Sequence, residues 1–113
     1  MYQRNISKTG NEELNNTTAV IAVADGIGSK SLAVGQFGCI IKAVRVTGGT
    51  TTDTTVKFYN GANLIKTLTS SSGAISNTDE LRMEKNGINK ITLTSAGDHS
   101  TNGLNWALDI EAK

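Results

Sequence analysis

Residues 104–111 read Leu-Asn-Trp-Ala-Leu-Asp-Ile-Glu, an alternation of apolar and polar side chains. Because successive side chains of a β-strand point to opposite faces, this period of two predicts a strand with one face in a core and the other in solvent. The buried side comprises Leu104, Trp106, Leu108 and Ile110. The indole of Trp106 is therefore expected in the core, with this last strand closing it.

Three further stretches have the composition of strands. Residues 90–94 alternate in the same way, with Ile91 and Leu93 on the core side and Lys90, Thr92 and Thr94 on a solvated side. Residues 19–24 and 39–46 are denser apolar runs, typical of central strands covered on both faces. Lys42 and Arg45 need an exit to solvent, which a β-bulge near Lys42 would supply.

Two Asn-Gly pairs, at residues 60–61 and 86–87, predict hairpin turns because both residue types favour positive φ. At the second turn, the apolar pattern pairs Leu81 with Leu93 and Met83 with Ile91. At the first, several registers satisfy the pattern equally. Loops are expected at residues 25–31, 48–53, 70–73 and 95–103, and residues 11–16 are compatible with one helical turn.

These segments predict an all-β protein, a single antiparallel β-sandwich or jelly roll of seven or eight strands. The sandwich would comprise residues 17–113. Residues 1–16 differ in composition, and two interpretations are open: an arm held by a neighbouring subunit, or a first strand paired within the domain. For the arm, Tyr2, Arg4 and Ile6 are the candidate partner contacts.

The composition argues against several classes of function. Thr, Gly, Asn and Ser make 47 of the 113 residues, whereas His and Cys occur once each. A net charge of +1 provides no field to attract nucleic acid or an anionic membrane. We find no apolar run of membrane-spanning length and no signal peptide, so we expect synthesis in a host cytoplasm. Cys39, in an apolar run, is expected to be a buried inert thiol.

No group of residues in the sequence has the spacing of a catalytic or metal centre. Residues 26–31 contain Gly, Lys and Ser but lack the spacing of a phosphate loop. The adjacent Asp98 and His99 are interpreted as solvated loop residues, and Asp79-Glu80 as part of an exposed charged face. Asp25, Asp53 and Asp98 do not have the ligand spacing of a calcium loop. We therefore predict a protein without enzymatic activity, cofactor or metal.

One short surface segment could contact a ligand. Tyr59 and Asn60 lie at the first predicted turn, where an exposed ring could stack on a sugar. An alternative function is thus a carbohydrate-binding or adhesin-type module, with Trp106 as a second ring if it were exposed.

The second half of the chain resembles small virion proteins of tailed phages. The shared pattern is a strand ending in Val46-Thr-Gly-Gly-Thr50, a strand and Asn-Gly turn over residues 56–61, a strand over residues 64–68, and the stretches at residues 86–88 and 91–97. The resemblance implies a structural component of the virion, foremost a capsid decoration or cement module, or else a head-fibre base, small tail part or connector. Its partners would be the major capsid protein or other virion proteins and copies of itself, without nucleic acid or membrane.

Overall fold

The computed structural model describes residues 4–23, 40–49, 52–71, 73–82 and 90–112, and over these residues the chain consists of β-strands and connections without a helix. The strands are β1 (Arg4–Glu12), β2 (Thr18–Val23), β3 (Ile40–Thr47), β4 (Thr54–Asn60), β5 (Asn63–Thr69), β6 (Ile75–Asn77), β7 (Leu81–Arg82), β8 (Lys90–Ser95) and β9 (Leu104–Ala112).

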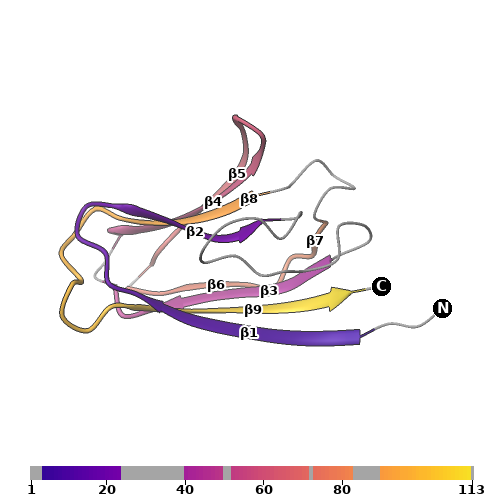
Figure 1. Ribbon diagram of the computed structural model, residues 1–113, viewed down its shortest axis with the longest axis horizontal. Coiled ribbons are helices and arrows are strands. Elements are labelled where there is room, and N and C mark those ends of the chain that lie inside the picture. The colour runs from indigo at the N-terminus through magenta and orange to yellow at the C-terminus, as the bar shows by residue number, and fades with distance from the viewer. Residues whose placement is uncertain (1–3, 24–39, 50–51, 72, 83–89, 113) are drawn as a thin grey trace.

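The strands form two antiparallel sheets stacked face to face (Figure 1). The first sheet has the order β1-β9-β3-β6, and β7 also pairs with β3. The second has the order β2-β8-β4-β5. Since β6 and β7 pair with different parts of β3, the described strands occupy eight sheet positions. The predicted all-β sandwich is confirmed.

The pairing order is nested and defines the topology as a jelly roll. The first strand pairs with the last, β2 with β8, β3 with β6 and β7, and β4 with β5. A long antiparallel hairpin wrapped around the core produces this order, because each successive pair falls alternately in one sheet and in the other. One consequence is that residues far apart in sequence, at the two ends of the chain, lie side by side.

The core lies between the sheets and is built from alternating positions. In β8, Ile91 and Leu93 are fully buried, as the sequence predicts. They pair with Phe58 and Val56 of β4, which are also fully buried. The first sheet contributes the inward-facing side chains of β3 and β9, which are Ile41, Val44, Val46, Leu104, Trp106, Leu108 and Ile110.

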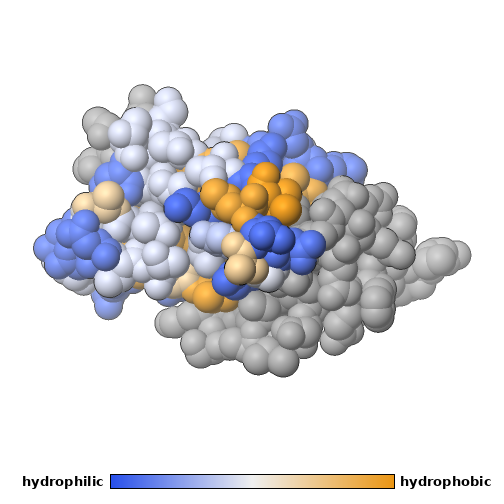
Figure 2. Space-filling view, turned by 90° about the horizontal axis from the view of Figure 1, so that it is seen from above, coloured by the Kyte–Doolittle hydropathy of each residue, from blue (hydrophilic) through white to orange (hydrophobic). Residues whose placement is uncertain are grey.

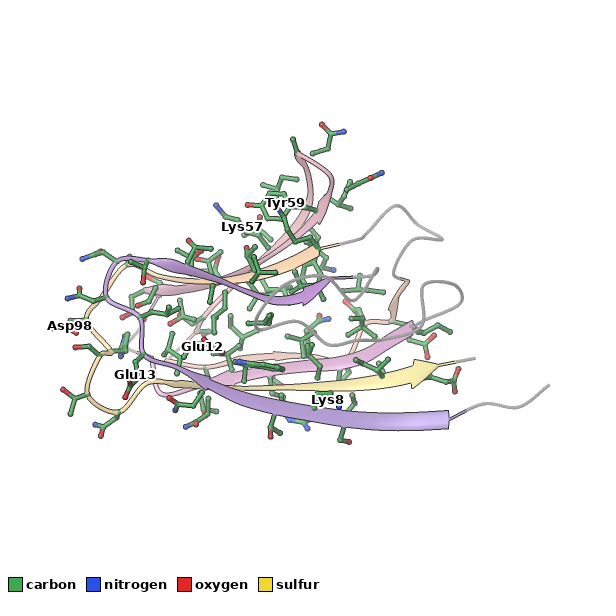
Figure 3. All side chains as sticks on the ribbon, viewed as in Figure 1. Lys8, Glu12, Glu13, Lys57, Tyr59 and Asp98 are labelled. Atoms are coloured by element: carbon green, nitrogen blue, oxygen red, sulfur yellow. The ribbon has the colours of Figure 1, made fainter. Side chains whose placement is uncertain are left out.

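Trp106 occupies the core beneath β1, as expected from the alternation. Its side chain is 5% exposed, and its Nε1 donates a hydrogen bond of 3.1 Å to Oε2 of the buried Glu12. Figure 3 shows Glu12 between the two sheets. Gly10 faces Trp106 across the β1-β9 pair, and a Cβ at this position would lie 2.5 Å from ring atoms of the indole. Glycine is therefore required here by close approach.

The two dense apolar runs, residues 19–24 and 39–46, contain strands at different positions in the sheets. β3 is central in its sheet, and its register with β9 shifts between Ile41 and Ala43, which confirms the predicted bulge at Lys42. The bulge turns Lys42 outward, where it forms an ion pair with Glu80. β2, in contrast, lies at the edge of its sheet among the described strands, which differs from the central position predicted for residues 19–24. β3 is also exposed on its outer face at Arg45.

The first hairpin is confirmed and has a two-residue loop. Asn60 pairs with Asn63, Gly61 has a φ of 61°, and Ala62 does not have a positive φ, a combination that fits a type II′ turn. The register predicted for the second hairpin is wrong, because Leu81 pairs with Ile41 rather than with Leu93. Both neighbours of β8 are already occupied, by β2 and β4. Met83 and the Asn-Gly pair at residues 86–87 lie outside the described residues.

The N-terminal segment forms β1, which pairs with β9 from Arg4 to Glu12. The helical turn considered for residues 11–16 is absent: β1 continues to Glu12, and Leu14 is then buried in the core. Pairing of β1 with β9 up to Glu12, rather than the helix propensity of Glu12, Glu13 and Leu14, determines the backbone conformation of this segment. Of the two interpretations of this segment, the structure shows the strand paired within the domain.

Thr92 differs from the solvated position predicted for it and offers a test of packing. It is 5% exposed, and its Oγ1 finds no hydrogen-bond partner among the described residues. A buried hydroxyl without a partner is costly, so Thr92→Val is expected to raise the free energy of unfolding by about 1 kcal/mol. The matched control is Thr94→Val, which removes the 2.8 Å bond between Thr94 and Thr18 and should lower stability. Urea denaturation measures both; a destabilised Thr92→Val protein would contradict the assignment.

Candidate functional site

The single histidine connects two loops at one end of the sandwich. His99 Nε2 lies 2.7 Å from Oδ2 of Asp53, and the two side chains are only 11% and 17% exposed. Asp53 also accepts a 3.0 Å hydrogen bond from Thr54 Oγ1. The prediction of a solvated loop histidine is wrong, because the jelly roll brings the segment before β4 against the β8-β9 connection.

The backbone around this pair is also tightly connected. His99 N donates to the Leu14 carbonyl at 2.7 Å, and Gly103 N donates to the His99 carbonyl at 2.9 Å. A Cβ at Gly97 would lie 2.5 Å from Oδ2 of Asp53. Among the hydrogen bonds of the described residues, none joins a hydroxyl to the His99 ring of this pair. Its geometry is that of a clamp between loops.

Asp98 is separate from this clamp. It is exposed, and Oδ1 accepts bonds from the side chain and the backbone N of Ser100, at 2.6 and 3.0 Å. The Ser100 hydroxyl lowers the pKa of the Asp98 carboxyl below its ordinary value. Because the folded-state pKa is lowered, the associated stabilisation is present above the ordinary carboxyl pKa and lost as the pH falls through the lowered one.

The other candidates for chemistry are not brought together. Asp79 is exposed, with Lys66 Nζ at 3.9 Å, which agrees with the predicted charged face. The glycine-rich segment at residues 26–31, Asp25 and Cys39 lie outside the described residues. Within the described part of the chain, no group of three or more His, Cys, Asp or Glu side chains could hold a metal ion. Likewise, no helix among the described residues is long and apolar enough to cross a membrane.

Tyr59 and Asn60 lie on the β4-β5 hairpin, which rises from the body of the molecule (Figure 1). Asn60 is exposed at the turn. The Tyr59 ring is half-buried, with Lys90 Nζ 4.7 Å from its centroid, a cation-π geometry. Figure 3 shows Lys57 and Tyr59 on the outer side of this sheet. The ring is thus partly engaged by a neighbouring cation.

Two exposed apolar residues lie beside Tyr59, at positions where the sequence pattern predicts only a strand. Leu64 pairs with Tyr59, and the register shift that follows leaves Ile65 without a strand partner. Leu64 is 51% exposed and Ile65 49% exposed. We name Tyr59, Leu64 and Ile65 the hairpin patch; Figure 2 shows hydrophobic residues gathered on this side of the molecule and flanked by hydrophilic ones. Two adjacent apolar residues in one strand were the available signal, because both cannot face one core.

Of the three residues predicted as partner contacts, Tyr2 lies outside the described residues. Arg4 and Ile6 are in β1, where their backbones pair with Ala112 and Ile110. Their backbone is thus held within the domain, and contact with a partner stays a prediction. Among the strands that the structure describes, β1 lies at the edge of the first sheet.

Comparison with known proteins identifies no family for this chain: no protein-family model matches it. No curated protein shows significant similarity to it either.

Proposed function

We propose that this protein is a structural component of a phage virion, a capsid decoration or cement module that attaches through the hairpin patch. The fold supports this by analogy, since jelly rolls include viral capsid domains as well as lectins. The observation that carries the proposal is the half-exposed Leu64-Ile65 pair on a projecting hairpin. Single exposed apolar residues are ordinary, but an adjacent pair on a raised hairpin suits insertion into a partner.

The binding free energy that one hairpin patch can supply is small, so attachment depends on many copies of the protein. Burying the exposed half of Leu64 and of Ile65 contributes about 1 kcal/mol each, which is insufficient for tight binding by one module. On a particle with many equivalent sites, multivalent contacts between copies strengthen attachment without new chemistry. Tyr2, Arg4 and Ile6 would supply a second contact in this proposal, through an N-terminal segment that runs along the edge of the first sheet.

The alternative function, carbohydrate binding through the rings of Tyr59 and Trp106, has less support. Trp106 is buried against Glu12 and offers no ring to a ligand, and Tyr59 is half-buried beside Lys90. A small tail part or connector would attach through the same kind of surface. The location of the protein in the particle distinguishes these roles from capsid decoration.

The test is incorporation of a double variant. Leu64→Ser with Ile65→Ser is expected to reduce the amount of protein in purified phage particles at least about tenfold, because both apolar anchors are lost. Quantitative mass spectrometry of particles produced by the genome that encodes this chain measures the effect. The matched control is Thr67→Ser with Thr69→Ser, at exposed positions of the same strand.

Three outcomes are decisive. Reduced incorporation of the double variant, with unaltered thermal unfolding and normal incorporation of the control, supports attachment through the hairpin patch. Equal incorporation of both variants would show that the hairpin patch is not the attachment surface. Absence of the unmodified protein from mature particles would overturn the proposed virion role itself.

A further inference from the structure

The outer face of the first sheet contains a shallow open groove that is separate from the hairpin patch. It encloses about 520 Å³. Gly10 and Trp106 contribute to its lining, and the outward-facing residues on its surface come from three adjacent strands and are Thr9, Asn11, Arg45, Thr47, Asn105 and Ala107. All lie on positions that alternate with core residues, so the groove opens away from the opposite sheet.

The register of the three strands explains why the surface is hollow there. Across β1, β9 and β3, the rows are Asn11-Asn105-Thr47, Thr9-Ala107-Arg45 and Ser7-Asp109-Ala43. The central residue of the middle row, Ala107, is smaller than the polar residues around it. Its short side chain forms a floor, and Thr9 and Arg45 form the two walls.

Polar atoms of defined direction lie at one end of the groove. Asn11 Nδ2 donates to Asn105 Oδ1 at 2.9 Å and to the Asn102 carbonyl at 3.1 Å. These two bonds use both hydrogens of the Asn11 amide. The first of these bonds fixes the Asn105 side chain through its oxygen, and the Asn105 NH₂ group has no acceptor among the described residues, so it can donate to a ligand.

Next to the other end of the groove, in the row Ser7-Asp109-Ala43, a carboxylate pairs with the Arg45 guanidinium. Asp109 accepts from Ser7 Oγ at 3.0 Å through Oδ1 and from Arg45 Nη2 at 3.3 Å through Oδ2. The guanidinium has five N–H donors, and this contact uses only part of them. Because Asp109 balances the charge of Arg45, this end presents donors and acceptors together with little net charge.

We propose that this groove binds a neutral saccharide chain. Hydroxyl groups both donate and accept, which matches donors on Arg45 and Asn105 in the groove and an acceptor on Asp109 in the adjacent row. Ala107 and the threonine methyl groups provide a small apolar floor for the C–H face of a sugar ring. An anionic ligand would meet Asp109 beside the groove, and an extended peptide lying in the groove could not pair with β9 or β3, because both strands are already paired on both sides. The inference is independent of the proposed attachment through the hairpin patch.

The probe is a panel of neutral oligosaccharides, with maltohexaose, cellohexaose and chitotetraose tested individually by ¹H-¹⁵N NMR titration of the full chain. At least one is expected to bind in the millimolar range and to shift signals of Thr9, Arg45 and Ala107. Ala107→Leu, which fills the hollow from its solvent side, is expected to weaken that binding at least about tenfold. Thr67→Leu is the matched control, because it adds the same side chain at an exposed position of the other sheet.

The result can overturn the inference in three ways. Absence of binding by all panel members at ligand concentrations of about 10 to 20 millimolar would refute a neutral saccharide site. Unchanged binding by a folded Ala107→Leu protein would place the site elsewhere. Stronger binding of a sialylated or uronate-containing glycan, or of an extended peptide, would show that the ligand class is wrong. Preserved NMR dispersion of both variants separates loss of the site from loss of the fold.

Discussion

Trp106→Ala is expected to lower the free energy of unfolding by about 3–5 kcal/mol, the largest effect of any substitution considered. The indole is buried, packs against Gly10 and donates to Glu12. Its removal leaves a large cavity and takes away one hydrogen bond from a buried carboxylate. Because β1 covers the ring, loosening of the contact between the two ends of the chain should accompany the loss of stability.

Equilibrium urea unfolding, followed by far-ultraviolet circular dichroism, measures this loss. Tyr59→Ala is the control, since it removes a half-buried ring from the hairpin patch, where solvent already reaches the side chain. We expect the control to cost much less. Similar small losses for both variants would mean that Trp106 is not part of the core and would reopen a surface role for its ring.

His99→Ala is expected to cost about 2 kcal/mol, the second largest effect. The substitution removes the bond to the Asp53 carboxylate and leaves that carboxylate in a poorly solvated position. Both loops at this end of the sandwich lose a connection, so amides of residues 52–54 and 97–103 should exchange faster with solvent. The imidazole contributes to stability through its position between the two loops.

Hydrogen-deuterium exchange combined with urea denaturation tests the clamp. The control is Asp98→Asn, at the adjacent but exposed position, whose contact is local to Ser100. We expect that variant to change stability by less than about 0.5 kcal/mol. If His99→Ala proved as benign as the control, the clamp would contribute nothing to stability, and a functional reason for the His99-Asp53 pair would have to be sought.

The parts of the fold that depend on local alternation could be predicted. The pattern around Trp106 and that around Ile91 and Leu93 each identified a strand and its buried face correctly. The bulge at Lys42 followed from one physical requirement, a charged side chain that must leave an apolar strand. Gly61 likewise indicated a hairpin through its conformational freedom.

The parts of the fold that depend on pairing between distant segments could not be predicted from the sequence. A turn signal predicts pairing between the two segments that flank it, so the sequence predicts that Leu81 pairs with Leu93. In the nested topology, Leu81 pairs with Ile41 instead. For the same reason His99 looked solvated, because its partner Asp53 is 46 residues away in sequence. The requirement for glycine at position 10 arises only once β1 lies over Trp106.

The candidate surfaces were partly accessible to sequence reasoning. The Asn-Gly turn correctly predicts that Tyr59 and Asn60 lie at a hairpin. The sequence pattern around Leu64 and Ile65 predicts a strand but not the exposure of these two side chains. The groove depends on Ala107, a small residue on the polar side of an alternating strand. Its significance appears only after Thr9 and Arg45 are brought to either side by strands from opposite parts of the sequence.

The most direct test of attachment through the hairpin patch is site-specific photo-crosslinking in assembled particles. With p-benzoylphenylalanine in place of Leu64, irradiation should produce a covalent adduct with the major capsid protein, identified by mass spectrometry. The same probe in place of the exposed Asn102, in the connection between β8 and β9, should not. An absence of adducts from position 64, or the same adducts from both positions, would contradict the account.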